Sequence, residues 1–279
     1  ALDSGINFFD TANLYSAGSS EEIVGKALKD FANRDDIVLA SKLYFPMFDG
    51  PNAKGLSRKS IFAEIDHSLK RLQTDYLDLY IIHRWDYGTP IEETMEALHD
   101  LVKMGKVRYI GASSMHGWQF AKAQFIAEKN GWTKFVSMQN LYNLLYREEE
   151  REMIPLLQDQ KVAMTPWSPL AGGRLTRDIG AITARASQAV QADLPAYIVA
   201  SDNEVISRVH KLADERGITR GQVATAWMLS KDYVTAPLIG ATKVNYLDDA
   251  LGAFEVALSA EEIKYLEEAY VPRNITGYR

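Results

Sequence analysis

Residues 5–15 read Gly5-Ile-Asn-Phe-Phe-Asp-Thr-Ala-Asn-Leu-Tyr15, and the interpretation of the whole chain starts from this stretch. An apolar strand ends on a carboxylate, Asp10, and a short polar turn then carries a phenol, Tyr15. In parallel α/β proteins, catalytic side chains lie where strands end and loops begin. A carboxylate beside a phenol is typical of proton transfer. A buried strand ending in a helix-capping aspartate would give the same pattern. Whether Asp10 and Tyr15 are catalytic therefore depends on partner residues further along the chain.

Apolar strand patterns alternate with amphipathic helical patterns along the rest of the chain, which predicts parallel β-α units. The predicted strands are 6–10, 37–41, 76–82, 107–113, 135–139, 162–166 and 234–239. Helices are predicted after Ser19 and Ser57, and over 90–105, 117–130, 147–160, 203–216, 219–230, 244–254 and 260–269. The run Glu148-Glu149-Glu150 within this pattern reads as a solvated helix start.

These seven β-α units predict one α/β domain, residues 1–279, folded as a (β/α)8 or TIM barrel. Residues 1–5 read as the last turn of a helix with its glycine cap, so we expect the chain to be N-terminally incomplete, with its first strand before residue 1. A doubly wound sheet is the alternative, although no G-x-G-x-x-G turn follows Asp10. The long connection 174–202 lacks periodicity and reads either as a lid or as a surface insertion.

Composition narrows the classes of function. The chain has 279 residues, 47% of them hydrophobic, and a formal net charge of −6 without a basic run. This balance argues against nucleic acid and anionic membrane as partners. The absence of cysteine excludes a thiolate nucleophile and a Cys-ligated zinc site, and it fits a cytoplasmic protein. We therefore expect a small-molecule substrate and no metal; the oligomeric state is left open.

Two further strand ends carry chemistry. Lys42 follows the strand 37–41 and His83 follows the strand 76–82. Taken alone, Lys42 could equally well be a surface amine without a catalytic role, and His83 could equally well be a core histidine. Together with Asp10 and Tyr15 they fall on one end of a parallel barrel, where Asp10 would orient Lys42, whose charge would stabilise the Tyr15 phenolate. His83 would then polarise a carbonyl oxygen.

This set resembles the catalytic tetrad of the aldo-keto reductase family, over essentially the whole chain. Asp10, Tyr15, Lys42 and His83 each match a tetrad position. The phrases Tyr109-Ile-Gly-Ala-Ser-Ser114 and Trp167-Ser-Pro-Leu-Ala-Gly-Gly-Arg174 are similar to the family branch of aryl-alcohol-dehydrogenase-like reductases and channel β-subunit relatives. The resemblance implies a barrel oxidoreductase that reduces an aldehyde or ketone, with aromatic compounds among the candidates, by hydride transfer with Tyr15 as the proton donor.

The resemblance also implies a nicotinamide cofactor, with NADPH preferred over NADH because Lys243, after the last strand, matches the position facing the 2′-phosphate. Trp167 matches the aromatic residue that stacks on the nicotinamide, or else is a core tryptophan. Tyr246 and Ala250 depart from the family's usual residues near the adenosine. The implied cofactor-binding residues are Ser113, Ser114, Gln139, Trp167, Ser168, Leu170, Gly172, Arg174, Gly240, Thr242, Lys243 and Asp249.

Tyr44 and Trp85 closely follow catalytic strands and are predicted to line the substrate pocket, with packing on the barrel rim as the competing account. Two other functions stay open. The chain could be a cofactor-binding, redox-sensing subunit with little turnover, or a barrel lyase in which Lys42 forms a Schiff base. The neighbouring Asp10 favours a charged, non-nucleophilic lysine and so places the lyase last.

Overall fold

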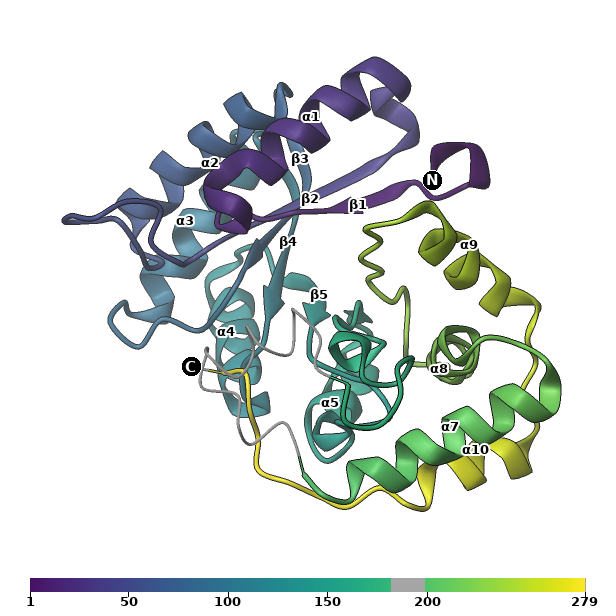
Figure 1. Ribbon diagram of the computed structural model, residues 1–279. Helices are drawn as coiled ribbons and strands as arrows, with labels where there is room; N and C mark the ends of the chain where they lie inside the picture. Colours follow the sequence, from purple (N-terminus) through teal and green to yellow (C-terminus); the bar gives the residue numbers. More distant parts are fainter. Residues whose placement is uncertain (182–198, 279) are drawn as a thin grey trace. The chain divides into compact units, whose positions relative to one another are not determined.

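The computed structural model of the protein describes residues 1–181 and 199–278 (Figure 1). These residues form two compact units, Ala1–Met138 and Gln139–Arg279. The single domain predicted for residues 1–279 remains a prediction. Most of the predicted lid, residues 182–198, lies outside the described residues.

Strands and helices alternate in the first unit, as the apolar pattern predicts. The bounds of its elements are η1 Leu2–Ser4, β1 Phe8–Asp10, η2 Tyr15–Gly18, α1 Ser19–Phe31, η3 Arg34–Asp36, β2 Val38–Leu43, α2 Arg58–Leu72, β3 Leu77–Ile82, α3 Ile91–Lys103, β4 Val107–Ser113 and α4 Gly117–Asn130. Strand β5, Phe135–Gln139, reaches the boundary between the units. β4 and β5 have the predicted bounds, and the other strands of this unit differ from prediction by one or two residues at either end.

The strands β1 to β4 pair in chain order and all pairs are parallel. The helices α1 to α4 pack each against the next (Figure 1). Helix α3 shows why: its residues Ile91, Met95, Leu98 and Leu101 recur at helical spacing and are all buried. Because parallel pairing aligns the carboxyl ends of neighbouring strands, residues that follow β1, β2 and β3 meet at one edge of the sheet.

One glycine allows the closest approach between two of these helices. A Cβ atom on Gly25, in α1, would lie 2.5 Å from the backbone of Leu72 at the end of α2. No real side chain tolerates that distance from a backbone atom. Gly25 therefore lets α1 contact the last turn of α2 directly.

At the amino-terminal end of β3, the ring of Tyr76 lies between two guanidinium groups. The Arg34 guanidinium carbon lies 3.9 Å from the ring centroid and that of Arg108 lies 4.0 Å from it. Arg34 also donates to the Tyr76 carbonyl (3.0 Å) and pairs with Asp78 (2.7 Å). This Tyr76 sandwich joins the segments before β2 and β3 to the start of β4 through cation–π contacts.

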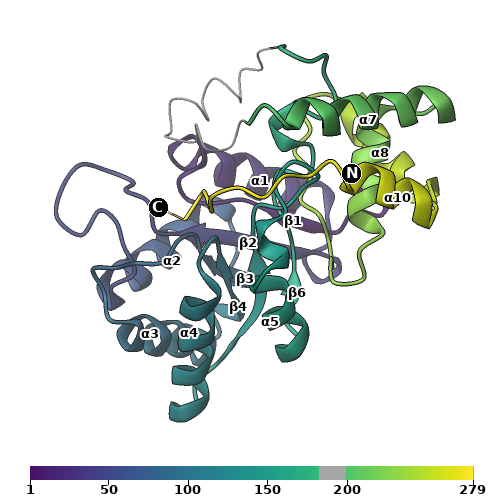
Figure 2. The same ribbon diagram turned by 90° about the horizontal axis from the view of Figure 1, so that it is seen from below.

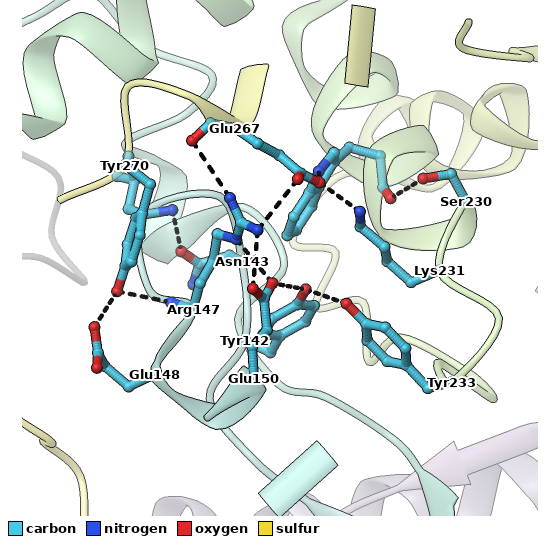
Figure 3. Close-up of polar contacts among 12 residues, drawn as sticks. Tyr142, Asn143, Arg147, Glu148, Glu150, Ser230, Lys231, Tyr233, Glu267 and Tyr270 are labelled. Atoms are coloured by element: carbon cyan, nitrogen blue, oxygen red, sulfur yellow. Dashed lines mark hydrogen bonds and ion pairs between the residues drawn. The ribbon is translucent and has the colours of Figure 1, made fainter. Parts of the chain in front are cut away.

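The second unit is mainly helical. Its elements are η4 Glu148–Glu150, α5 Met153–Gln160, β6 Ala163–Met164, η5 Ala171–Gly173, α7 Asp202–Arg216, α8 Arg220–Leu229, α9 Val244–Gly252, η7 Ala253–Glu255 and α10 Ala260–Glu267. Helix α7 packs against both α8 and α10 (Figure 2). Arg147 connects η4 to α10, because it pairs with Glu150 (2.8 Å) and with Glu267 at the end of α10 (3.2 Å), as Figure 3 shows.

Two predicted elements of this unit are wrong in detail. The helix predicted over 147–160 is regular only from Met153, because the ring of Pro155 would clash with the Arg151 carbonyl in a longer helix. The predicted strand 234–239 is not a strand, although its Thr235 amide donates to the carbonyl of Met164 in β6. The Met164 amide in return donates to the Thr235 side chain (3.2 Å). Pro237, which has no N–H group, cannot donate to a ladder within 234–239.

Within residues 1–181 and 199–278, none of the helices combines the length and apolar character needed to cross a membrane.

Candidate active site

The ends of three neighbouring strands bring Asp10, Lys42 and His83 together in the first unit. Asp10 is the last residue of β1 and pairs in register with Ala40 of β2. Lys42 stands opposite Ile81 of β3, and the amide of His83 donates to the Leu43 carbonyl (2.9 Å). The backbone amide of Asn13 in turn donates to the backbone carbonyl of Lys42 (3.1 Å), which fixes the start of the turn leading to Tyr15.

The Lys42 ammonium is the centre of this cluster. Its Nζ donates to Asp10 Oδ2 (2.5 Å), to the Thr11 carbonyl (2.8 Å) and to the Tyr15 hydroxyl (3.3 Å). The side chain of Lys42 is fully buried. The three N–H groups of a protonated amine thus each have an acceptor, and the carboxylate of Asp10 balances the buried charge. This arrangement favours a charged lysine, which has no lone pair for a Schiff base.

Tyr15 presents its hydroxyl to Lys42 while remaining accessible. The residue is 40% exposed, and its ring meets that of His83 edge to face with centroids 5.8 Å apart. Because Lys42 donates to the Tyr15 oxygen, the phenol can donate its own hydrogen to another group. The geometry is that of a proton donor held beside a fixed positive charge.

His83 is buried and neutral. Burial lowers its pKa well below the usual value, and the positive charges of Lys42 and Arg84 lower it further. Its Nδ1 atom is buried with no hydrogen-bond partner among the described residues. Placing the proton on Nε2 avoids burying an N–H group without an acceptor. A neutral His83 with an Nε2–H group can donate a hydrogen bond to a carbonyl oxygen without releasing a proton.

Further aromatic side chains lie beside this cluster. Phe45, not Tyr44, contacts His83, with ring centroids 5.1 Å apart. Trp85 is buried, at 7% exposed, and contacts Trp118, which is 54% exposed. Tyr44 and Trp85 remain predicted pocket residues.

Asp86, in the loop that follows β3, forms a hydrogen bond to the loop that follows β2. Its Oδ2 atom accepts from the Leu56 amide (2.7 Å) and from the Thr89 hydroxyl (2.8 Å). A Cβ atom on Gly55 would lie 2.7 Å from the same oxygen, so this approach requires glycine. Sequence reasoning gave Asp86 no role of its own. Its spacing from Gly88, whose amide it also binds, is a turn signal that could have found it.

The predicted cofactor residues divide between the two units. Ser113 and Ser114 lie at the end of β4 in the first unit, and both are buried, with hydroxyl oxygens 3.2 Å apart. Ser114 adopts a φ of 49°. The second unit holds the others, beginning with Gln139, which is buried at the end of β5.

In the second unit, Trp167 and Ser168 begin a tight turn. The Trp167 amide donates to the Asn140 carbonyl (2.8 Å), and the Ser168 hydroxyl accepts from the Gly172 amide (3.1 Å). Trp167 is half-buried. The turn thus holds a half-buried indole in a fixed backbone.

Arg174, predicted to face a pyrophosphate, pairs with the fully buried Asp202 (2.7 Å). Asp202 also pairs with Arg273 near the C-terminus (2.5 Å). Two guanidinium groups share one carboxylate, so these three residues together keep one formal positive charge. Asp202 was missed because nothing in its local sequence marks it as buried.

The last predicted group lies at the surface of the second unit. Gly240, Thr242 and Lys243 are exposed, and Asp249 is half-buried. Helix α9 begins directly after Lys243, whose Nζ lies 5.9 Å from the Tyr246 ring centroid. An exposed cation at a helix N-terminus is suited to an anionic group.

The expectation of a solvated Glu148-Glu149-Glu150 run is wrong for two of its members, because Glu148 and Glu149 are buried. Glu149 accepts hydrogen bonds from the Tyr278 hydroxyl and the Asn140 amide. Burial raises the pKa of Glu149 to about 7, against the opposing effect of these two hydrogen bonds. A run of three acids normally reads as solvent-facing, and the burial comes from the C-terminal residues, which are remote in sequence.

Stability should therefore fall as pH rises through this group. Between its unfolded pKa of 4.5 and about 7, the folded state binds the Glu149 proton more tightly than the unfolded state does. The contribution is complete below pH 4.5 and is lost by about pH 7, amounting to about 3 kcal/mol. Urea unfolding at pH 5 and pH 8 should show a larger loss in the wild type than in Glu149→Gln. Asp159→Asn is the matched control, because Asp159 is an exposed acid on α5 of the same unit. Equal losses in wild type and Glu149→Gln would contradict the prediction.

Residues 1–271 match the sequence profile of the Aldo/keto reductase family. A Schizosaccharomyces pombe protein named as a putative aryl-alcohol dehydrogenase is 47% identical over 99% of this chain and 85% of its own length. An aldo-keto reductase of Fusarium vanettenii is 44% identical over 100% of this chain and 81% of its own. The versiconal hemiacetal acetate reductase of Aspergillus parasiticus is 45% identical, with 99% and 86% covered.

Proposed function

This chain belongs to the aldo/keto reductase family, and from that premise we propose that it reduces the carbonyl group of an aldehyde or ketone to an alcohol with NADPH. The family fold is a (β/α)8 barrel, so the barrel predicted from alternating strands and helices is confirmed. The resemblance to aldo-keto reductases and to their aryl-alcohol-dehydrogenase-like members is confirmed as well. The chain is thus an oxidoreductase, and the substrate class and cofactor are the proposal.

The observation that carries the proposal is the hydrogen-bonded group of Lys42, Asp10 and Tyr15 beside a neutral His83. Reduction of a carbonyl places negative charge on its oxygen, which must be stabilised and then protonated. Tyr15 would donate the proton to that oxygen. The Lys42 ammonium would stabilise the resulting phenolate, and the Nε2–H group of His83 would orient the oxygen by a hydrogen bond.

The residues present fit a nicotinamide dinucleotide. The hydroxyls of Ser113 and Ser114 and the amide of Gln139 are the donor and acceptor types that a carboxamide requires. The half-buried indole of Trp167 suits a flat ring, and the positive charge shared by Arg174 and Arg273 suits a diphosphate. When bound, the reduced nicotinamide supplies the hydride. Lys243 at the start of α9 would favour NADPH through its 2′-phosphate.

The test measures consumption of NADPH and of NADH with a panel of aromatic and aliphatic aldehydes. The readout is the decrease in absorbance of the reduced nicotinamide. We expect turnover that prefers NADPH, with aromatic aldehydes among the better substrates. Replacement Lys243→Met should raise the Kd of NADPH and leave that of NADH unchanged. NADPH binding without turnover of any substrate would overturn the proposal and support the redox-sensing alternative.

A further inference from the structure

The turn that carries Tyr15 has an unusual backbone. Tyr15–Gly18 forms the short helix η2, yet Ser16, Ala17 and Gly18 have φ values of 50°, 52° and 95°. Three successive residues in the left-handed region, two of them not glycine, form a conformation that the surrounding structure must hold in place. Ser16 and Ala17 are exposed and Gly18 is buried, so the holding contacts come from the ends of the turn.

Glu21, three residues after the turn, supplies the strongest of these contacts. It is fully buried and accepts from the Ser41 hydroxyl (2.5 Å) and from Arg71 Nε (2.6 Å). Ser41 immediately precedes Lys42 on β2. Glu21 therefore connects the segment bearing Tyr15 to the strand bearing Lys42, and Arg71 anchors both to α2. We call Glu21, Ser41 and Arg71 the Glu21 bridge.

Arg71 also touches the turn itself. A Cβ atom on Gly18 would lie 2.8 Å from Arg71 Cδ and 3.1 Å from Nε, so the arginine stem covers the glycine. On either side, the Thr11 and Ser20 hydroxyls lie 2.8 Å apart and Asn13 donates to Glu64 of α2 (2.8 Å). These contacts are shorter than the 3.3 Å hydrogen bond between Lys42 and Tyr15, which is the one that a small movement of the turn would break.

We propose that Glu21, held by Arg71, is a positioning residue that keeps the Tyr15 hydroxyl within hydrogen-bond reach of Lys42. The proposal rests on the proposed function, in which Tyr15 is the proton donor. Without the buried carboxylate, Ser16 and Ala17 relax toward right-handed backbone conformations. The Tyr15 hydroxyl then leaves Lys42, while the cofactor residues Ser113 and Ser114 are unaffected.

The decisive variant is Glu21→Gln, which keeps the size of the side chain and removes its charge. We expect kcat to fall at least tenfold, with KM for aldehyde and Kd for NADPH within twofold of wild type. Amide hydrogen exchange of the cofactor-free protein should become faster at residues 15–18. Asp30→Asn is the matched control because Asp30 is an exposed acid on the same helix, paired with Lys26 at 2.6 Å; it should change neither readout.

A rescue separates positioning from general support of the fold. Adding Ala17→Gly to Glu21→Gln gives the exposed position a residue that adopts a positive φ freely, so kcat should recover at least threefold. Arg71→Lys, which keeps a positive charge, should retain more activity than Arg71→Met. Wild-type kcat and exchange rates in Glu21→Gln would overturn the proposal, as would a loss of kcat that Ala17→Gly leaves unchanged.

The wild type and Tyr15→Phe are measured alongside these variants. Absence of turnover in the wild type, or full activity in Tyr15→Phe, is a failure of the proposed function. In that case the exchange rates at residues 15–18 still decide whether Glu21 holds the turn. Normal wild-type turnover with an unaffected Glu21→Gln variant is a failure of the positioning role alone.

Discussion

Replacing Tyr15 with phenylalanine is expected to lower kcat for carbonyl reduction by roughly a hundred- to ten-thousandfold, the range for loss of a positioned proton donor. This corresponds to about 3–5 kcal/mol of transition-state stabilisation. The fold should tolerate the change because Tyr15 is 40% exposed and its hydroxyl contacts Lys42 at 3.3 Å. Removal of one oxygen leaves no cavity in the core.

The measurement is single-turnover reduction of an aldehyde by NADPH, with the Kd of NADPH determined separately. Cofactor binding should stay within about threefold of wild type, an effect below about 1 kcal/mol. Tyr109→Phe is the matched control, since Tyr109 is an exposed phenol in the same unit, at 57% exposure on β4. A Tyr15→Phe variant that keeps more than a tenth of wild-type kcat would rule out Tyr15 as the proton donor.

Lys42→Met is expected to impair both activity and stability. Methionine fills most of the lysine's volume but removes the ammonium that pairs with the carboxylate of Asp10, which is 11% exposed. Breaking a buried ion pair by removing one member costs about 3–5 kcal/mol. Activity should fall by roughly a hundredfold or more, because the charge proposed to stabilise the phenolate is also lost.

The double variant Asp10→Asn with Lys42→Met separates the two effects. Removing both charges should restore most of the unfolding free energy in urea, while kcat stays as low as in Lys42→Met. Lys26→Met serves as the control, because Lys26 belongs to the exposed pair with Asp30 and such pairs contribute about 1 kcal/mol or less. An active double variant would show that the buried charge is not needed for the reaction.

The sequence was sufficient to predict that Asp10, Lys42 and His83 meet because of the geometry of parallel sheets. Each of the three lies at the end of a recognisable strand, and parallel pairing brings such ends to one edge without further information. Tyr15 follows from its short distance along the chain. The barrel could also be predicted, because each strand and each helix shows a local apolar pattern and the alternation of the two patterns is typical of this fold.

What could not be predicted depends on contacts between residues remote in sequence. Glu149 is buried by Tyr278, and Asp202 by Arg174 and Arg273, so their local sequences carry no sign of burial. The strand predicted at 234–239 is an exception, because Pro237 within it lacks the N–H group that a ladder requires and is a local signal against a strand. The arrangement of the Tyr15 turn likewise needed coordinates, because two of its left-handed residues are not glycine.

The Tyr76 sandwich and the candidate active site lie at opposite ends of β3, so residues that support the sheet are distinct from residues near the site. It lies just before β3, whereas His83 follows the same strand, and six residues of strand span about 20 Å. A lineage can therefore exchange the predicted pocket residues beyond the far end of β3 while Arg34, Tyr76 and Arg108 keep the sheet intact. Robustness at one end of the strand provides the tolerance from which new specificity at the other end can arise.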